Sequence, residues 1–321
     1  MKTVLALLLT VIACTTASAA EFPSRRIEVV AAGAAGGGLD AVSRVLDRAL
    51  HEAKLIDQPM VINNIQGAAG DAAKSYVAQK KGDAHVLYVE SNRIFQNKIL
   101  GTTQLGMEDF TPIARVMTEY NVWAVRAEAP YRSARDILDL IRKDPLAVPF
   151  GVGGLPGNDY FNIVRPAMIH GAEYRKLRIA SFQSGGKLMM QLLGGHVPVI
   201  STTLSEAAEQ AKAGKVRIIA TSAPAPMAGE FKSVPTWRSM GIDVHILHWR
   251  GIFAPLGVPR EVVAFWDDRL GKLARTEIWK KALEQHGWYD AYVDSATFRK
   301  ELEPEREVTA KLLRELGFAK Q

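Results

Sequence analysis

A glycine-rich turn between a predicted strand and a predicted helix constrains the fold of this chain more than any other feature. Residues 27–31 form a short apolar run typical of a buried strand, and residues 40–53 carry apolar side chains at helical spacing. Such a unit presents free backbone N–H groups and the positive end of a helix, which suits an anionic ligand. The turn consists of Gly36, Gly37, Gly38, Leu39 and Asp40.

The same alternation of strands and helices continues along the chain and predicts an α/β fold with mainly parallel sheets. We expect further strands at 61–63, 86–89, 121–126, 148–152, 177–181, 197–201, 216–221, 244–247 and 251–254. We expect helices at 72–80, at 133–143, after Gly157, from Gly186 and from Leu204, and then a helical tail over 260–274, 277–285 and 295–316.

About 300 residues after the leader suit two domains of ordinary size. Two arrangements fit the pattern: the domains follow each other, or the helical tail returns to cover the first. We take the second. It places domain I at 21–122 plus 249–321 and domain II at 123–248, with crossovers near 121–126 and 243–250 that form a hinge.

The N-terminus has the features of an export signal. Lys2 precedes an apolar stretch over 4–13 that is too short to span a bilayer, and Ala17-Ser18-Ala19 fits a cleavage site. We therefore expect residues 1–20 to be a signal peptide and the mature protein to be periplasmic. The only cysteine, Cys14, ends a loose lipoprotein cleavage box, so lipid anchoring at Cys14 is the alternative.

The charge of the chain is mild and dispersed. Lys plus Arg number 40 and Asp plus Glu 34, a formal charge of +6, without a basic block or interleaved aromatic residues. This pattern does not favour a nucleic-acid partner. The histidines show no zinc-type spacing, and His245 and His248 stand three apart in a strand-like run, so they point to opposite faces. We expect neither a metal nor a cofactor.

Four loops at predicted strand ends share one chemistry. In an open α/β sheet, strand ends and helix starts meet at the edge where ligands bind. Nucleotides are scarce outside the cytoplasm, so we expect these loops to hold a small organic carboxylate. The candidate residues are those of the first turn, Gly36–Asp40; Ser91, Asn92 and Arg93; Gly157, Asn158 and Asp159; and Ser184, Gly185, Gly186 and Lys187.

Individual side chains in these loops have alternative roles. Lys187 at a helix N-terminus opposes the helix dipole, so either an anionic ligand justifies it or it is a solvated lysine. Arg93 and Arg250 offer bidentate carboxylate contacts or ordinary ion pairs. Trp249 either packs against a ligand or lies in the core. Asp40 either holds its own loop or bonds a ligand hydroxyl.

An enzymatic alternative rests on Ser184-x-x-Lys187, which matches the S-x-x-K of exported serine acyl transferases. The companion Ser-Asp-Asn and Lys-Thr-Gly motifs are absent from the sequence, as is a G-x-S-x-G elbow. We therefore expect a receptor rather than an enzyme, with an exported hydrolase as the alternative.

Several motifs in order resemble those of one family, the periplasmic solute receptors of tripartite tricarboxylate transporters, or Bordetella uptake gene family. The resemblance covers essentially the whole mature chain and is closest to the tricarboxylate-binding branch. The motifs are Ala35-Gly36-Gly37-Gly38-Leu39-Asp40, Phe182-Gln183-Ser184-Gly185-Gly186-Lys187, Leu192-Leu193-Gly194-Gly195-His196-Val197, Ser201-Thr202-Thr203-Leu204-Ser205-Glu206, Ala213-Gly214-Lys215-Val216-Arg217 and Arg250-Gly251-Ile252-Phe253-Ala254-Pro255.

The resemblance implies a monomeric two-domain venus flytrap that hands an organic anion to a membrane permease. It adds Thr202 and Thr203 to the expected ligand-binding residues. Ala35 stands where the family often has proline, and Leu39, Lys187 and Thr203 replace an aromatic residue, an acid and Asp. These departures imply a pocket with less negative charge, and a ligand that carries more negative charge or lacks the hydroxyl or ammonium group that an acid would recognise. A di- or tricarboxylate meets this description, and an aromatic acid is also allowed. A sensory receptor for the same solutes is a further alternative.

Overall fold

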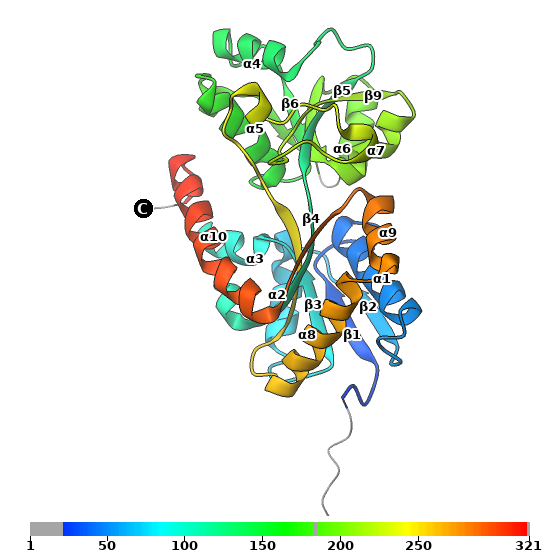
Figure 1. The fold of residues 1–321 in the computed structure, drawn as a ribbon. Coiled ribbons are helices and arrows are strands. Elements are labelled where there is room, and N and C mark those ends of the chain that lie inside the picture. The colour runs from blue at the N-terminus through cyan, green and yellow to red at the C-terminus, as the bar shows by residue number, and fades with distance from the viewer. Residues whose placement is uncertain (1–21, 183–184, 320–321) are drawn as a thin grey trace, which may run out of the picture.

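The computed structural model describes residues 22–182 and 185–319, which form two α/β units stacked one above the other (Figure 1). We call the unit with the six-stranded sheet, ordered β11-β4-β10-β3-β1-β2, domain I. Domain II holds the five-stranded sheet, ordered β7-β6-β8-β5-β9. The predicted α/β two-domain class is confirmed. The predicted signal peptide, Cys14 and Ser184 lie outside the described residues.

Both sheets are mixed rather than mainly parallel. In domain I, β1 pairs in parallel with β2 and β3, whereas β10 pairs antiparallel with β3 and β4, and β11 antiparallel with β4. The strands are β1 Ile27–Ala31, β2 Met60–Asn64, β3 Val86–Glu90, β4 Phe110–Glu119, β10 His248–Pro255 and β11 Tyr289–Val293. The helices of this domain are α1 Gly38–Glu52, α2 Asp71–Ala78, α3 Arg93–Ile99, α8 Arg260–Ala274 and α9 Glu277–His286.

In domain II, β6 pairs in parallel with β7 and β8, and β5 pairs antiparallel with β8 and β9. Its core contains Trp123 and Trp237, which are fully buried and meet edge to face. The strands are β5 Asn121–Arg126, β6 Phe150–Val152, β7 Ile179–Ser181, β8 Val199–Thr203 and β9 Val216–Thr221. The helices are α4 Ala134–Lys143, α5 Asn158–Ile169, α6 Gly185–Leu193 and α7 Leu204–Lys212.

Capping residues explain several helix ends. Ser133 accepts a hydrogen bond from the Asp136 N–H at the start of α4, and the Asp136 carboxylate accepts one from the Ser133 N–H. Thr276 caps α9 in the same position, and Gly287 ends it in the left-handed region at φ +66°. These local signals are why the predicted bounds of both helices agree closely with the observed ones.

The chain passes between the sheets at Tyr120, which joins β4 to β5, and again just before β10. Residues 242–247 are coil, so the strand expected at 244–247 is wrong, and the run at 248–255 is one strand. His245 therefore does not lie in a strand. Strands β4 and β11 and helix α3 were not expected from the sequence. The domain boundaries expected at 122/123 and 248/249 stay a prediction.

The last helix, α10 Ser295–Glu315, spans both domains along one side of the molecule (Figure 1). Leu302 belongs to the core of domain I, whereas Leu313 is fully buried in the core of domain II. Beyond the helix, the Phe318 ring meets the Tyr160 ring of α5 at 5.2 Å. In the described residues, no helix combines the length and the apolar character needed to cross a membrane.

Candidate functional site

A cavity of about 500 Å³ lies between the two domains. Its lining includes residues from all four predicted loops. From the predicted site residues the cavity brings together Gly36, Gly37, Gly38, Leu39, Ser91, Asn92, Arg93, Gly157, Asn158, Asp159, Gly185, Thr203 and Arg250. Segments from across the chain therefore converge on one cleft, as the argument from strand ends predicted.

The first turn is held open by its own aspartate. Asp40 is 4 % exposed and accepts a hydrogen bond from the Gly36 N–H at 2.8 Å, while Arg44 lies 3.0 Å away on its other side. Hydrogen bonds from these groups lower the pKa of Asp40 against the opposing effect of burial. Asp40 is not among the described residues that line the cavity, and its two bonds hold the turn.

Two features of this turn favour an anion. Gly36 adopts φ +78°, which L side chains rarely adopt. The first intrahelical bond of α1 runs from the Ala41 N–H to the Gly37 carbonyl at 2.9 Å, so the N–H groups before it have no acceptor within the helix. The N-terminus of α1 thus points unsatisfied donors and a positive dipole toward the cleft.

Arg250 of β10 lies against the same helix end. A Cβ added at Gly38 would come within 3.1 Å of Nη2 of Arg250. This guanidinium is 5 % exposed and forms an ion pair with Glu119, the last residue of β4. Glu119 also accepts a hydrogen bond from Ser205 of domain II at 2.6 Å. Nε of Arg250 is buried without a hydrogen-bond partner.

Domain II contributes two carboxylates to the cleft. Asp159 accepts hydrogen bonds from the Gly153 N–H at 2.9 Å and from Asn121 at 2.6 Å. Desolvation, together with the nearby Glu206, raises the pKa of Asp159 to about 8. Glu206 of α7 accepts a hydrogen bond from Thr202, and desolvation also raises its pKa. Its carboxylate lies so close to Gly185 that a Cβ there would overlap it.

One hydrogen bond crosses the cleft directly between loops. Asn92 of domain I donates to the Asn158 side chain of domain II at 3.0 Å, and both residues are buried. The neighbouring Arg93 lines the cavity, but its guanidinium is engaged by Glu90 at 2.9 Å and by the Ala32 carbonyl at 2.8 Å. Arg93 therefore fixes the loop after β3.

Some predicted residues lie elsewhere. The expectation that Trp249 faces a ligand is not met: it is fully buried, meets Phe95 and Phe298, and donates to Glu305 at 2.8 Å. Successive residues of a strand face opposite sides, so His248 and Arg250 line the cleft while Trp249 packs toward α10. Thr202, Gly186 and the exposed Lys187 are likewise not among the described residues that line the cavity.

Other lining residues were not expected from the sequence as ligand contacts. Glu119 and His248 face each other across the β4–β10 pair, and Glu206 and Ser205 open helix α7. His286 and Trp288 reach the cleft from the end of α9, with their rings stacked at 4.5 Å. Desolvation lowers the pKa of both His248 and His286. Among the described residues, no cluster of three or more His, Cys, Asp or Glu side chains could hold a metal ion.

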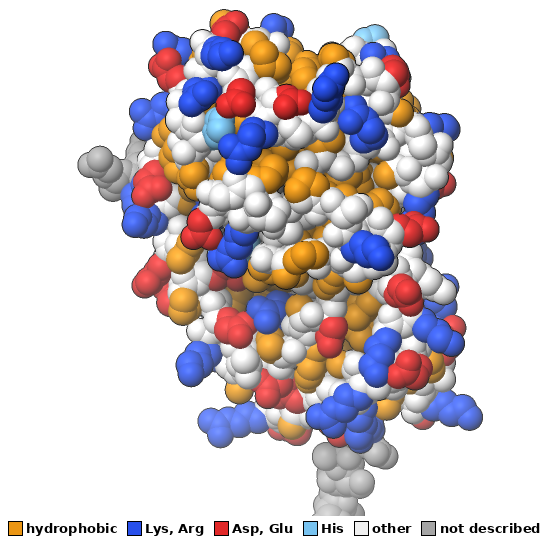
Figure 2. Space-filling model, turned by 45° about the horizontal axis from the view of Figure 1, so that its top comes forward, with side chains coloured by type: hydrophobic (Ala, Val, Ile, Leu, Met, Phe, Trp, Pro, Cys, Tyr) orange, Lys and Arg blue, Asp and Glu red, His pale blue; other side chains and the backbone are white. Residues whose placement is uncertain are grey.

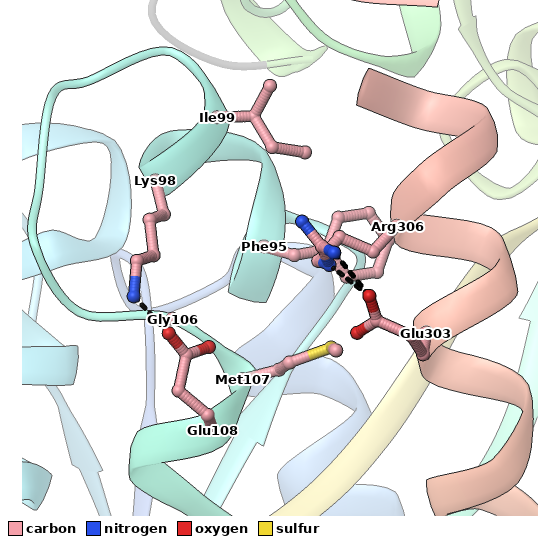
Figure 3. Close-up of a pocket in the computed structure, with 8 residues that line it drawn as sticks. All are labelled: Phe95, Lys98, Ile99, Gly106, Met107, Glu108, Glu303 and Arg306. Atoms are coloured by element: carbon pink, nitrogen blue, oxygen red, sulfur yellow. Dashed lines mark hydrogen bonds and ion pairs between the residues drawn. The ribbon is translucent and has the colours of Figure 1, made fainter. Parts of the chain in front are cut away.

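A second cavity, of about 420 Å³, lies between α3 and α10 in domain I (Figure 3). Its floor is formed by Phe95, Ile99 and Met107, and ion pairs stand at its rim: Lys98 with Glu108, and Arg306 with Glu303. The charged side chains of this groove are thus paired with each other. The face drawn in Figure 2 shows acidic and basic side chains interspersed, without one dominant charged patch.

Comparisons with known proteins identify the family of this chain. Residues 42–318 match the model of the tripartite tricarboxylate transporter family receptor. The chain is 24 % identical over 270 residues to the "UPF0065 protein in tcbD-tcbE intergenic region" of a Pseudomonas species, covering 83 % of this chain and 79 % of that protein. It is 21 % identical to Protein BugT of Bordetella pertussis, over 84 % of this chain and 82 % of that one.

Solved structures show the same fold. R. palustris Rpa4515 with adipate superposes with a TM-score of 0.83 at 22 % identity, over 93 % of this chain and 99 % of that chain. MatC from Rhodopseudomonas palustris with bound malate gives 0.77 at 22 % identity, over 91 % and 100 %. With the family model matching residues 42–318, this chain belongs to the receptor family of the tripartite tricarboxylate transporters.

Proposed function

We propose that this protein is a periplasmic receptor that captures a small organic carboxylate in the cleft between its domains and delivers it to a tripartite tricarboxylate-type permease. The observation that carries the proposal is the pairing, in one cavity, of the open N-terminus of α1 with the buried guanidinium of Arg250. Backbone N–H groups and an arginine at a helix end are what a carboxylate requires.

The proposed contacts come from both domains. The N–H groups of Gly38 and Leu39 bind one carboxylate of the ligand, and Asn158 and Thr203 approach from the other side. The ligand contacts both domains only when they are closed, so it stabilises the closed form. Structures of relatives solved with malate and adipate support a carboxylate ligand of this size, including dicarboxylates.

The remaining parts of the proposal concern the cell. Residues 1–20 direct export and are removed, and the mature receptor acts as a monomer. A receptor that signals to a membrane kinase would use the same clamp, so only the partner separates that function from transport. An exported hydrolase using Ser184 and Lys187 is the enzymatic alternative, and labelling by a serine-directed acylating agent would support it.

A thermal-shift screen tests the proposal. The panel contains di- and tricarboxylates, aromatic acids and acidic amino acids, each with its alcohol or amide analogue as the uncharged control. A true ligand at a hundredfold excess over its Kd should stabilise the protein by about 2.7 kcal/mol. Gly37→Val, which places a branched side chain in the α1 turn, should abolish that shift while the far-UV circular dichroism stays unchanged. If no carboxylate stabilises the protein, the proposed function is wrong.

A further inference from the structure

The two sides of the cleft differ in what they offer a ligand. On the side of domain I, the first N–H groups of α1 and the Nε of Arg250 are donors without acceptors in the described structure. Only 5 % of Arg250 is exposed, so a donor without a partner there is costly unless a ligand accepts a hydrogen bond from it. This side suits one carboxylate.

The side of domain II is already occupied by carboxylates of the protein. Glu206 lies against Gly185, the first residue of α6, where an external anion would otherwise bind. The Asp159 carboxylate accepts a hydrogen bond from the Gly153 N–H in the loop before α5. The positive ends of these two helices therefore face protein carboxylates, and a second ligand carboxylate has no equivalent position there.

The cations of the lining offset these two acids only in part. Arg93 pairs with Glu90, and Arg250 pairs with Glu119. Both histidines of the lining have a lowered pKa and are therefore neutral at pH 7. Among the described residues that line the cavity, no further lysine or arginine faces Asp159 and Glu206. Of the three acids in the lining, Glu206 is the most exposed.

Building on the proposed function, we infer that the ligand is bipolar: a carboxylate at the α1 end and a protonated amine at the other, with Glu206 selecting the amine. An ammonium group placed there donates to the Glu206 carboxylate and offsets the unfavourable burial of that charge. A carboxylate placed there meets like charge and binds only by taking up a proton. The differences from the family pattern at Lys187 and Thr203 predicted a less acidic pocket, but that prediction did not include the carboxylates of Glu119 and Glu206.

Two matched ligand pairs test the inference: adipate against 6-aminohexanoate, and succinate against 4-aminobutanoate. The members of each pair have the same number of carbon atoms and differ only in whether the far end is a carboxylate or an ammonium. We expect isothermal titration at pH 7 to show one amino acid binding about tenfold or more tighter than its dicarboxylate, the factor expected of one charge-assisted hydrogen bond.

The variant Glu206→Gln keeps the size and the acceptor oxygen but removes the charge. It should weaken the amino acid, strengthen the dicarboxylate and bring their ratio close to one. The control is Glu209→Gln, an equal charge change on the same helix at an exposed position outside the cavity lining, which should leave the ratio unchanged. Circular dichroism and thermal melting confirm that both variants fold.

The outcomes separate this inference from the proposed function. If a dicarboxylate binds as well as or better than its amino acid, or if Glu206→Gln leaves the preference unchanged, the bipolar ligand is wrong and the carboxylate receptor stands. The same holds if none of the four compounds binds while another acid does. If no acid of any kind binds, both proposals fail.

Discussion

Removing the charge of Arg250 is the most informative perturbation, because it separates the stability of the hinge from ligand binding. Arg250 and Glu119 are 5 % and 2 % exposed, so they form a buried ion pair. Breaking such a pair by removing one partner costs about 3–5 kcal/mol, because the other charge stays buried without compensation. Arg250→Met keeps most of the side-chain length beneath Gly38, so the cost should arise from the isolated Glu119 carboxylate.

A second substitution tests that explanation. Replacing a buried pair with neutral residues of similar volume is often close to neutral for stability. In Arg250→Met/Glu119→Gln, the glutamine still accepts the hydrogen bond of Ser205, so most of the lost stability should return and leave about 1 kcal/mol or less. Binding should not return, because the guanidinium next to α1 is gone in both variants.

Urea unfolding, followed by tryptophan fluorescence and far-UV circular dichroism, measures both variants against the wild type. Coincident transitions are needed before a free energy is taken from a two-domain chain. The reasoning is refuted if Arg250→Met costs less than about 1 kcal/mol, or if the double variant is as unstable as the single one. Recovery of ligand binding in the double variant would show that Arg250 serves the hinge alone.

Three further predictions follow from single residues. Gly36→Ala should lower the free energy of unfolding by about 1–2 kcal/mol and weaken binding, because Gly36 has a φ of +78°. The control Gly154→Ala adds the same methyl group to the cavity lining at a residue without a positive φ, and it should be nearly neutral in urea unfolding. The pKa of Asp159 rises from 3.8 to about 8 on folding, so the stability of the wild type falls as the pH rises through that interval. The Tm of Asp159→Asn minus that of the wild type, measured by calorimetry, should therefore increase from pH 5 to pH 8, and a decrease would contradict this. Trp249→Phe should lower stability by about 1–3 kcal/mol through loss of the hydrogen bond to Glu305, and a ligand titration should show an unchanged Kd.

The α1 turn could be predicted from the sequence because its interactions are local. Asp40 holds the Gly36 N–H four residues away, and Arg44 pairs with Asp40 one helical turn further on. Glycines, an acid and an amphipathic stripe within one short segment therefore contain the information that shapes this half of the site. The same applies to the loop closed by Asp159, which bonds Gly153 six residues earlier.

The acidic and basic centre of the cleft could not be predicted, because it depends on strand pairing between distant segments. Arg250 and Glu119 are 131 residues apart in the chain and meet because β10 pairs with β4. Strand β4 is also hard to predict from the sequence because it contains Pro112, and a proline argues against a central strand. In the structure, Pro112 pairs with Phe253 at a register shift in the β4–β10 ladder, where a missing N–H is tolerated.

The position at which β10 begins, rather than its amino-acid composition, determines which side of the sheet each of its residues faces. The sequence singled out the pair Trp249-Arg250, and the two-residue period of a strand sends them to opposite sides. Once β10 begins at His248, Arg250 faces the cleft and Trp249 enters the core beside α10. The two runs expected from the sequence, 244–247 and 251–254, left this pair between strands, so the side that each residue faces was undetermined.

Glu119 links the hinge to the site. It ends β4, one residue before the chain crosses at Tyr120, and it is held by Arg250 from domain I and by Ser205 from domain II. Any rotation about the Tyr120 crossing must either carry this three-residue contact as a unit or break the Ser205 bond. Because Arg250 also lies against the first turn of α1, the proposed carboxylate site and the contact between the domains share the same buried carboxylate, Glu119. A substitution at Glu119 should therefore change binding and domain closure together, whereas one at Asp40 should act on the α1 turn alone.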